Sequence, residues 1–373
     1  MKDQQQLLYR IALTMIPGVG SVLAKNLISY CGSEEAVFRQ KKKLLEKIPE
    51  VGPKTAAVIS RHDPFSMAEK EVEFILKHKI KTYFYLDKDF PQRLKHCHDS
   101  PILLYFKGEA NLNKPRMISL VGTRTPTEYG KMVSDILVDQ LAAFEVTIVS
   151  GLAYGIDIHA HRAALRNNMP TIGVVAHGLD RLYPGSHRST AVRMIEDGGI
   201  ITEYPSGTNP DRENFPSRNR IVAGMCDAVV VIEAPAKSGA LITADIAQSY
   251  DRDVFAIPGR IDDPFSIGCN KFIMQNRAAL ITSADDIAYL MGWDNEAEGS
   301  TKNIKGTQQQ QLFFELNTEE TVIMELLKEH EKLDIDLIML KAKIPFSKLS
   351  GVLLGLEMKG AIRSLPGKVY QRI

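Results

Sequence analysis

Short apolar runs that alternate with helical patterns constrain the fold of this 373-residue chain more than any other feature. Most of the runs lead through Gly-, Pro- or Ser-containing residues into an amphipathic stretch. Alternating strands, loops and helices are typical of a parallel, doubly wound α/β sheet with buried strands. In such sheets a ligand binds beyond the carboxyl ends of the strands, so those loops are where function is expected. The predicted strands are 117–121, 147–150, 171–176, 200–203, 228–233, 254–257 and 279–282.

The first 65 residues contain an internal repeat. IPGVGSVLA at 16–24 aligns with IPEVGPKTA at 48–56, and each copy places a Pro/Gly turn before an apolar helix. This pattern predicts a helix–hairpin–helix (SAM-like) domain over 1–65. Free backbone N–H groups at such turns suit a phosphate, and Lys25 and Lys54 lie near them. The alternative is that both turns only join packed helices.

The C-terminal part predicts a tether followed by a small domain. Residues 294–317 are rich in Glu, Gly, Ser and Thr and include a run of glutamines, so they read as a flexible linker. Helical patterns and a final hairpin predict a winged helix over 318–373. Its third helix is mostly apolar, with Lys348 and Lys359 as its only basic residues. A protein contact or a structural role therefore competes with DNA reading there.

Composition and charge exclude several classes. A hydrophobic content of 44% with 24% charged residues predicts a soluble globular protein, expected in the cytoplasm and away from membranes. The four cysteines include no CxxC pair, so neither a disulfide framework nor a zinc site is expected. Residues 1–62 hold ten Lys and Arg against five Asp and Glu, whereas 63–317 hold 27 against 32. The large middle domain, 66–293, would therefore bind nucleic acid only through a local pocket.

Three loops of the middle domain predict anion sites at helix N-termini. The loop after the first strand is neither GxGxxG nor a Walker sequence, so no nucleotide cofactor is expected. It combines a Gly turn with hydroxyls and an arginine that can clamp a phosphate or, alternatively, pair with a carboxylate. The residues expected at these three sites are Gly122, Thr123 and Arg124; Ser150 and Gly151; and Lys237, Ser238 and Gly239.

A fourth segment, RENFPSRNR at 212–220, has arginines around an aromatic residue. Cations that hold phosphates beside a ring that stacks on a base suit single-stranded nucleic acid. The candidates are Arg212, Phe215, Arg218 and Arg220. The alternative is a helix start with a buried ring and structural arginines. Asp157 and His161 lack a third partner for a metal, so they are expected to hold their loop by hydrogen bonds.

Taken in order, these loops resemble the bacterial DprA/Smf family, the DNA-processing protein A of natural transformation. The resemblance runs from about residue 100 to 282. The matching motifs are Val121-Gly122-Thr123-Arg124, Ser150-Gly151 through Gly155-Ile156-Asp157, Gly178-Leu179-Asp180 with Tyr183-Pro184, Glu203-Tyr204-Pro205, Phe215-Pro216-Ser217-Arg218-Asn219-Arg220, Ser238-Gly239 with Thr243-Ala244, and Pro258-Gly259 with Gly268-Cys269-Asn270.

The resemblance implies a Rossmann-like core that binds single-stranded DNA without sequence preference and forms a homodimer. It further implies protection of incoming single strands and loading of RecA past single-strand-binding protein, without catalysis. By motif position, the phosphate pocket falls on the three loops above and the basic and stacking residues on 212–220.

Two alternatives stay open at this level. Related Rossmann-like folds hydrolyse nucleotides, in which case Glu233 or Asp245 would act as acid or base. A pure scaffold would use the winged helix to dock a partner while the middle domain binds nothing.

Overall fold

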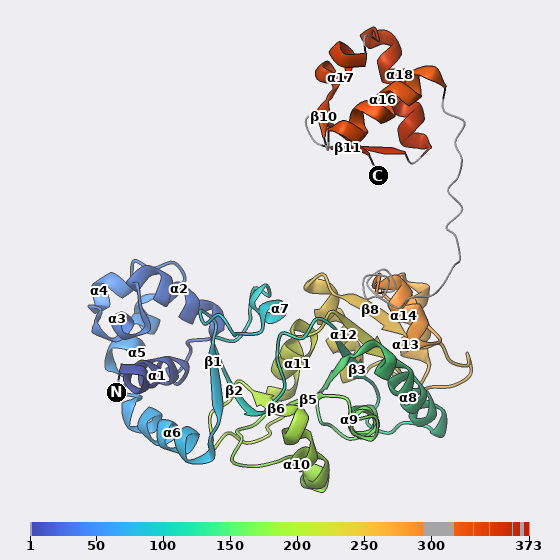
Figure 1. Cartoon of the computed structure of the whole chain (residues 1–373). Coiled ribbons are helices and arrows are strands. Elements are labelled where there is room, and N and C mark those ends of the chain that lie inside the picture. The colour runs from blue at the N-terminus through green and yellow to red at the C-terminus, as the bar shows by residue number, and fades with distance from the viewer. Residues whose placement is uncertain are drawn as a thin grey trace. The chain divides into compact units, whose positions relative to one another are not determined.

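The computed structural model describes residues 2–293, 317–330, 332–342, 344–359, 361–365 and 369–372. The chain divides into two compact units, Met1–Gly299 and Ser300–Ile373. Most of the predicted linker, 294–316, lies outside the described residues. The larger unit contains a mostly parallel nine-stranded sheet between two layers of helices, with a helical lobe at its N-terminus (Figure 1).

The sheet is wound in both directions from a central strand. Its order is β1-β2-β6-β5-β4-β3-β7-β8-β9, so the chain runs from β3 to one side and returns to β7 on the other. The seven strands predicted from the sequence all form and pair in parallel. The strands are β1 (Lys81–Phe84), β2 (Leu103–Gly108), β3 (Met117–Val121), β4 (Thr147–Ser150), β5 (Thr171–Val174), β6 (Gly199–Thr202), β7 (Ala228–Val231), β8 (Asp253–Ala256) and β9 (Ala279–Leu280).

Strands β1 and β2 escaped the sequence prediction. Strand β1 pairs with β2, and β2 pairs with β6, both in antiparallel fashion, for example Tyr105 opposite Thr202. An antiparallel pair needs no crossover helix, so the strand–loop–helix alternation that marks the other strands is missing here.

Alternating side chains of the buried strands feed two cores. In β3, Ile118 and Leu120 pack with the helices of one face, and Met117 and Val121 with those of the other. The first face holds α8 (Glu128–Leu141), α9 (Ile156–Arg166) and α14 (Ala284–Leu290). The second holds α7 (Gln92–Lys95), α11 (Asn214–Gly224), α12 (Gly239–Ser249) and α13 (Ile267–Met274). The remaining helices of this part are α10 (Arg188–Asp197) and the 3-10 turns η1 (Ala142–Phe144) and η2 (Gly185–His187).

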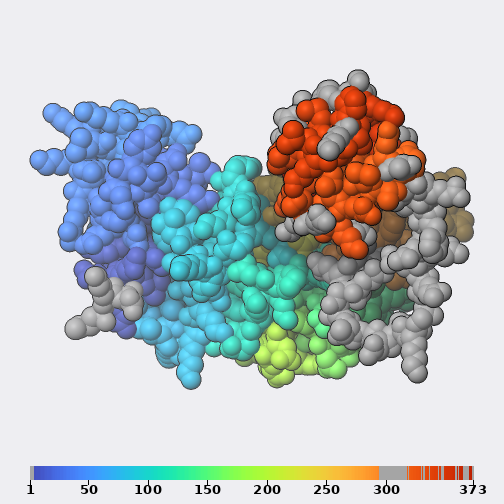
Figure 2. All heavy atoms as spheres, turned by 45° about the horizontal axis from the view of Figure 1, so that its top comes forward, coloured from blue at the N-terminus to red at the C-terminus, as the bar shows by residue number. Residues whose placement is uncertain are grey.

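The N-terminal helices share a core with β1 and β2. Ile11 and Leu27 pack in one buried cluster with Phe84 and Tyr105, and the lobe lies beside the cyan β1–β2 segment (Figures 1 and 2). The repeat is visible in the backbone, since Gly18 and Glu50 both adopt positive φ, at 78° and 67°. The helices are α1 (Lys2–Thr14), α2 (Ser21–Cys31), α3 (Glu34–Arg39), α4 (Lys42–Leu45), α5 (Pro53–Arg61) and α6 (Phe65–His78).

The first turn of the repeat faces protein. Val19, Gly20 and Ser21 line a cavity of about 170 Å³ together with Glu203. The ammonium of Lys25 donates to Ser100 Oγ at 2.7 Å. Burial, followed by the charge of Arg220, lowers the pKa of Lys25. Lys25 is therefore engaged within the protein and not free to bind a phosphate at the first turn. Lys54 at the second turn is exposed.

The smaller unit has the predicted winged-helix elements and one further strand. They are α16 (Thr318–Glu329), β10 (Leu333–Asp334), α17 (Ile335–Ala342), α18 (Phe346–Met358), β11 (Ile362–Leu365) and β12 (Val369–Arg372), with sheet order β10-β12-β11. Both lysines of the third helical segment pair with acidic residues of α16, Lys348 with Glu319 and Lys359 with Glu320. These pairs engage the two cations that DNA reading by this helix would use.

Candidate nucleic-acid interface

A pocket of about 640 Å³ lies where the sheet changes winding direction. Strand β3 leads to β4 on one side while β7 adjoins its other edge, so the loops after these strands diverge around a crevice. The position of the pocket at the carboxyl ends of the strands matches the sequence expectation. Its lining includes Gly122, Thr123, Arg124, Gly151, Ala153, Asp157, Tyr183, Pro210, Arg212, Phe215, Arg218, Asn219, Ser238, Gly239, Ile242 and Thr243.

Arg124 is exposed and takes part in no ion pair between described residues. Its guanidinium carbon lies 5.4 Å from the centroid of the Phe215 ring. The Tyr183 ring lies 6.1 Å from the same ring. The alternative in which Arg124 pairs with a carboxylate is therefore not what the structure shows. An uncommitted guanidinium beside two aromatic rings is suited to a phosphate with an adjoining base.

The first predicted anion site, at the start of α8, is filled by a carboxylate of the protein. Glu233 is 1% exposed, and its oxygens accept from the backbone N–H of Thr127 at 2.9 Å and from the Thr127 hydroxyl. Thr127 in turn caps the helix by accepting from Gly130 N. A ligand anion at this helix start would meet the negative charge of Glu233, so Arg124 is the group of this loop left to hold it.

The second predicted site, after β4, is filled in the same way. Asp157 Oδ2 accepts from the backbone N–H of Gly151 at 3.0 Å and of Ala153 at 3.4 Å. Burial raises the pKa of Asp157, while the charge of Arg218 and these hydrogen bonds oppose that shift. The expectation that Asp157 holds its loop is met. The amides of this loop are thus committed within the protein.

The third predicted site, at the start of α12, is open. Ser238 is the N-cap and accepts from Leu241 N at 3.4 Å. Gly239 is exposed, and the space beside its Cα contains no atom within 4 Å of where a Cβ would lie. Lys237 is exposed next to the N-cap but is not among the lining residues. Of the three predicted anion sites, this helix N-terminus is the one free to meet a phosphate.

The arginines of 212–220 separate in space. Arg212 is exposed at the pocket, whereas Arg218 is only 4% exposed and donates to the carbonyl of Val174 beneath it. Arg220 points away, pairing with Glu203 and donating to Asp99 O at 2.6 Å. Successive α-helical residues are about 100° apart, so one short stretch cannot turn all its arginines to one side.

Two predicted contacts are therefore corrected. Ser150 is fully buried and its hydroxyl donates to Leu120 O at 2.6 Å, so this group holds two strands together. Arg220 fastens α11 to β6 and to the Asp99 loop. Sequence reasoning also missed Tyr183 as part of the pocket wall. Its only signal was its place in the Tyr183-Pro184 motif.

The fully buried His161 on α9 predicts acid sensitivity. Its Nδ1 lies 2.7 Å from the Thr171 hydroxyl, which itself donates to Ile148 O, so Nδ1 carries the proton. Burial, then the charges of His187 and Arg218, lower the pKa of His161 from 6.5 to about 3. The residue therefore stabilises the fold fully above pH 6.5, and this contribution is lost as the pH falls toward 3 because only the unfolded chain is protonated.

We expect the free energy of unfolding to lose about 2 kcal/mol through His161 between pH 7 and pH 5. Urea titrations at pH 7 and pH 5 measure the free energy of unfolding. In His161→Gln its fall between the two pH values should be about 2 kcal/mol smaller than in the wild type. The exposed His96→Gln is the matched control and should behave like the wild type. An unchanged pH dependence in His161→Gln would contradict the assignment.

In the part of the chain that the structure describes, no helix is long and apolar enough to cross a membrane. Within the same residues, no three His, Cys, Asp or Glu side chains are grouped in a way that could hold a metal ion.

The fold and the pocket define the class: a Rossmann-like protein with an arginine-lined pocket at the sheet's switch point, a helical N-terminal lobe and a C-terminal winged helix. The family model described as DNA recombination-mediator protein A matches residues 81–292. The chain belongs to this family, which confirms the DprA/Smf resemblance. Residues 11–60 match a SAM-like helix-hairpin-helix tandem, and 309–368 match the DprA winged helix domain.

Individual relatives agree. The chain is 31% identical to Protein Smf of Synechocystis sp., over 98% of each chain. Its structure is similar to that of DNA processing protein A from Streptococcus pneumoniae, with a TM-score of 0.66 and 33% identity over 76% of this chain and 97% of that one. It is also similar to DNA processing protein A from Helicobacter pylori, solved for its single-stranded DNA binding mode, with a TM-score of 0.53 and 29% identity over 58% of this chain and 97% of that one.

Proposed function

We propose that this protein is a recombination mediator that binds single-stranded DNA in the pocket, without sequence preference. The observation that carries the proposal is the coincidence, in one crevice, of an open helix N-terminus with Arg124, Arg212 and the Phe215 ring. Phosphates and stacked bases are common to every single strand, so these groups bind without reading sequence. Membership of the DNA recombination-mediator protein A family supports the same role.

The proposed contacts are narrower than the sequence expectation. The phosphate chain is held by Arg124, Arg212, Lys237 and the α12 start at Ser238 and Gly239, while Phe215 stacks on a base. Gly122, Thr123, Gly151 and Arg218 shape the pocket around them. We propose domains at 1–65, 66–293 and 318–373, with a linker at 294–317 and DNA bound by the middle domain.

Fluorescence anisotropy with labelled single-stranded and duplex oligonucleotides tests the proposal. We expect a strong preference for single strands and weaker binding at higher salt, because phosphate contacts release counterions. Deleting 318–373 should leave this binding in place. Equal affinity for both DNA forms would contradict the pocket, and loss of binding on deletion would transfer it to the winged helix.

The finer role follows from the family resemblance. We propose that the protein works as a homodimer on incoming strands in natural transformation, protects them, and helps to load RecA in the presence of single-strand-binding protein. The test is RecA-dependent ATP hydrolysis on DNA precoated with single-strand-binding protein. Stimulation by the wild type and none by a DNA-binding variant is expected, and equal stimulation by both would contradict the mediator role.

The nucleotide-hydrolase alternative loses its candidate groups. Glu233 is committed to Thr127, and Asp245 pairs with Arg277 on the outer side of α12. Neither carboxylate lines the pocket. Incubation with mononucleotides is therefore expected to release neither base nor phosphate.

A further inference from the structure

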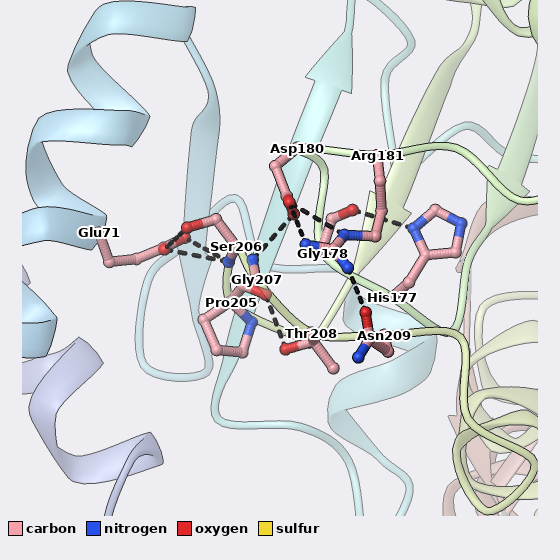
Figure 3. Close-up of polar contacts among 10 residues, drawn as sticks. All are labelled: Glu71, His177, Gly178, Asp180, Arg181, Pro205, Ser206, Gly207, Thr208 and Asn209. Atoms are coloured by element: carbon pink, nitrogen blue, oxygen red, sulfur yellow. Dashed lines mark hydrogen bonds and ion pairs between the residues drawn. The ribbon is translucent and has the colours of Figure 1, made fainter.

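Glu71 on α6 is a buried carboxylate that serves a segment far from it in sequence. It is 3% exposed, whereas Glu69 and Glu73 on the same helix are exposed. Its two oxygens accept from the backbone N–H of Ser206 at 3.1 and 3.0 Å, and one also accepts from the Ser206 hydroxyl (Figure 3). Among the described residues no basic side chain pairs with Glu71. Its desolvation is therefore offset by this one residue.

The segment that begins at Ser206 is also held from its other side. Asp180 Oδ1 accepts from Gly207 N at 2.9 Å, and Gly178 N donates to Thr208 O at 3.2 Å. Arg181 bridges Asp180 Oδ2 and the side-chain oxygen of Asn209. Figure 3 shows this arrangement, with Glu71 reaching in from α6 and Asp180 and Arg181 closing on the same loop.

The hydrogen bonds continue from Asn209 to the pocket wall. Asn209 O accepts from Asp211 N at 2.9 Å and from the side chain of Asn214, the first residue of α11, at 3.1 Å. Pro210 and Arg212, which lie between these bonded residues, line the pocket. Phe215 follows directly, so the placement of both proposed DNA-contacting side chains of this wall depends on residues 206–211.

We infer that Glu71 is a positioning residue for DNA binding, through which helix α6, which packs against the N-terminal helices, sets the geometry of the pocket wall. The inference rests on the proposed function of the pocket. Residues 206–211 belong to the loop 204–213, which connects β6 with α11. Without the carboxylate this loop opens more often, and the fraction of molecules whose pocket can bind DNA falls. The apparent dissociation constant rises by the reciprocal of that fraction.

Glu71→Gln tests the tether because it keeps the size of the side chain but removes the negative charge and one of the two acceptor oxygens, so the hydrogen bonds to Ser206 are no longer charge-assisted. Hydrogen exchange of the free protein should show protection of 204–213 falling about tenfold, with the central strands β3 to β5 unchanged. The dissociation constant for a single-stranded oligonucleotide should rise about fivefold. Glu73→Gln, on the exposed side of the same helix, should change neither quantity.

The outcomes separate this inference from the function on which it rests. If Arg124→Ala weakens DNA binding but Glu71→Gln leaves it unchanged, the positioning role is wrong and the pocket stands. If Arg124→Ala has no effect, the proposed function is wrong, and the inference is overturned with it. Should Glu71→Gln fail to fold, Ser206→Ala removes only the hydroxyl bond, and a loss of 204–213 protection and of affinity by about threefold is expected. No change in Ser206→Ala would overturn the inference.

Discussion

Replacing Arg124 by Ala should weaken the binding of single-stranded DNA about ten- to hundredfold, which corresponds to about 1–3 kcal/mol. The guanidinium is exposed at the pocket, lies over the Phe215 ring and is not engaged by a carboxylate among the described residues. Arg124 can therefore bind a phosphate without first breaking an ion pair within the protein. Arg124→Lys should fall between wild type and Ala, because an ammonium keeps the charge but loses the two-pronged geometry.

Anisotropy titrations at two salt concentrations measure this loss. The dependence of binding on salt should also become shallower by about one counterion in Arg124→Ala. Arg193→Ala provides a matched control, since Arg193 is an exposed arginine on α10 outside the pocket lining. Equal losses in both variants would mean that net charge and not the pocket holds the DNA.

Replacing Gly155 by Ala should destabilise the protein by about 3 kcal/mol or more. Gly155 precedes α9 with φ +84° and ψ −131°, a conformation that residues with a Cβ rarely adopt. An added Cβ would also lie 2.1 Å from Thr123 O, so it would push the loop after β3 away from the loop after β4. Because both loops line the pocket, DNA binding should fall together with stability.

Urea denaturation and DNA titration of the same preparation check this expectation. Gly185→Ala is the control, because a Cβ there would have no atom within 4 Å and the backbone has no positive φ. Its free energy of unfolding should stay within about 0.5 kcal/mol of wild type. A Gly155→Ala protein as stable as Gly185→Ala would show that the two loops are free to move apart.

Much of the architecture could be predicted from the sequence, because it depends on local patterns. The buried strands, the Gly-containing turns and the winged-helix elements each leave a signal within about twenty residues. The antiparallel β1 and β2 leave none of the alternation used to find the others. Their place at the sheet edge is set by the pairing of β2 with β6, which lies about a hundred residues later in the sequence, and by contacts with the N-terminal lobe.

The amino-acid sequence alone determined which loops carry anion-binding residue types and in which order they occur. It thereby determined the family to which the protein belongs. Only the tertiary structure decided which of those loops are free. Glu233 lies 106 residues from Thr127, the N-cap residue whose backbone N–H it accepts from, and Asp157 turns back onto the amides of its own loop. The physical reason is that a helix N-terminus attracts any anion within reach. The folded backbone determines whether a carboxylate of the protein already occupies that position or whether it stays open for an anionic ligand.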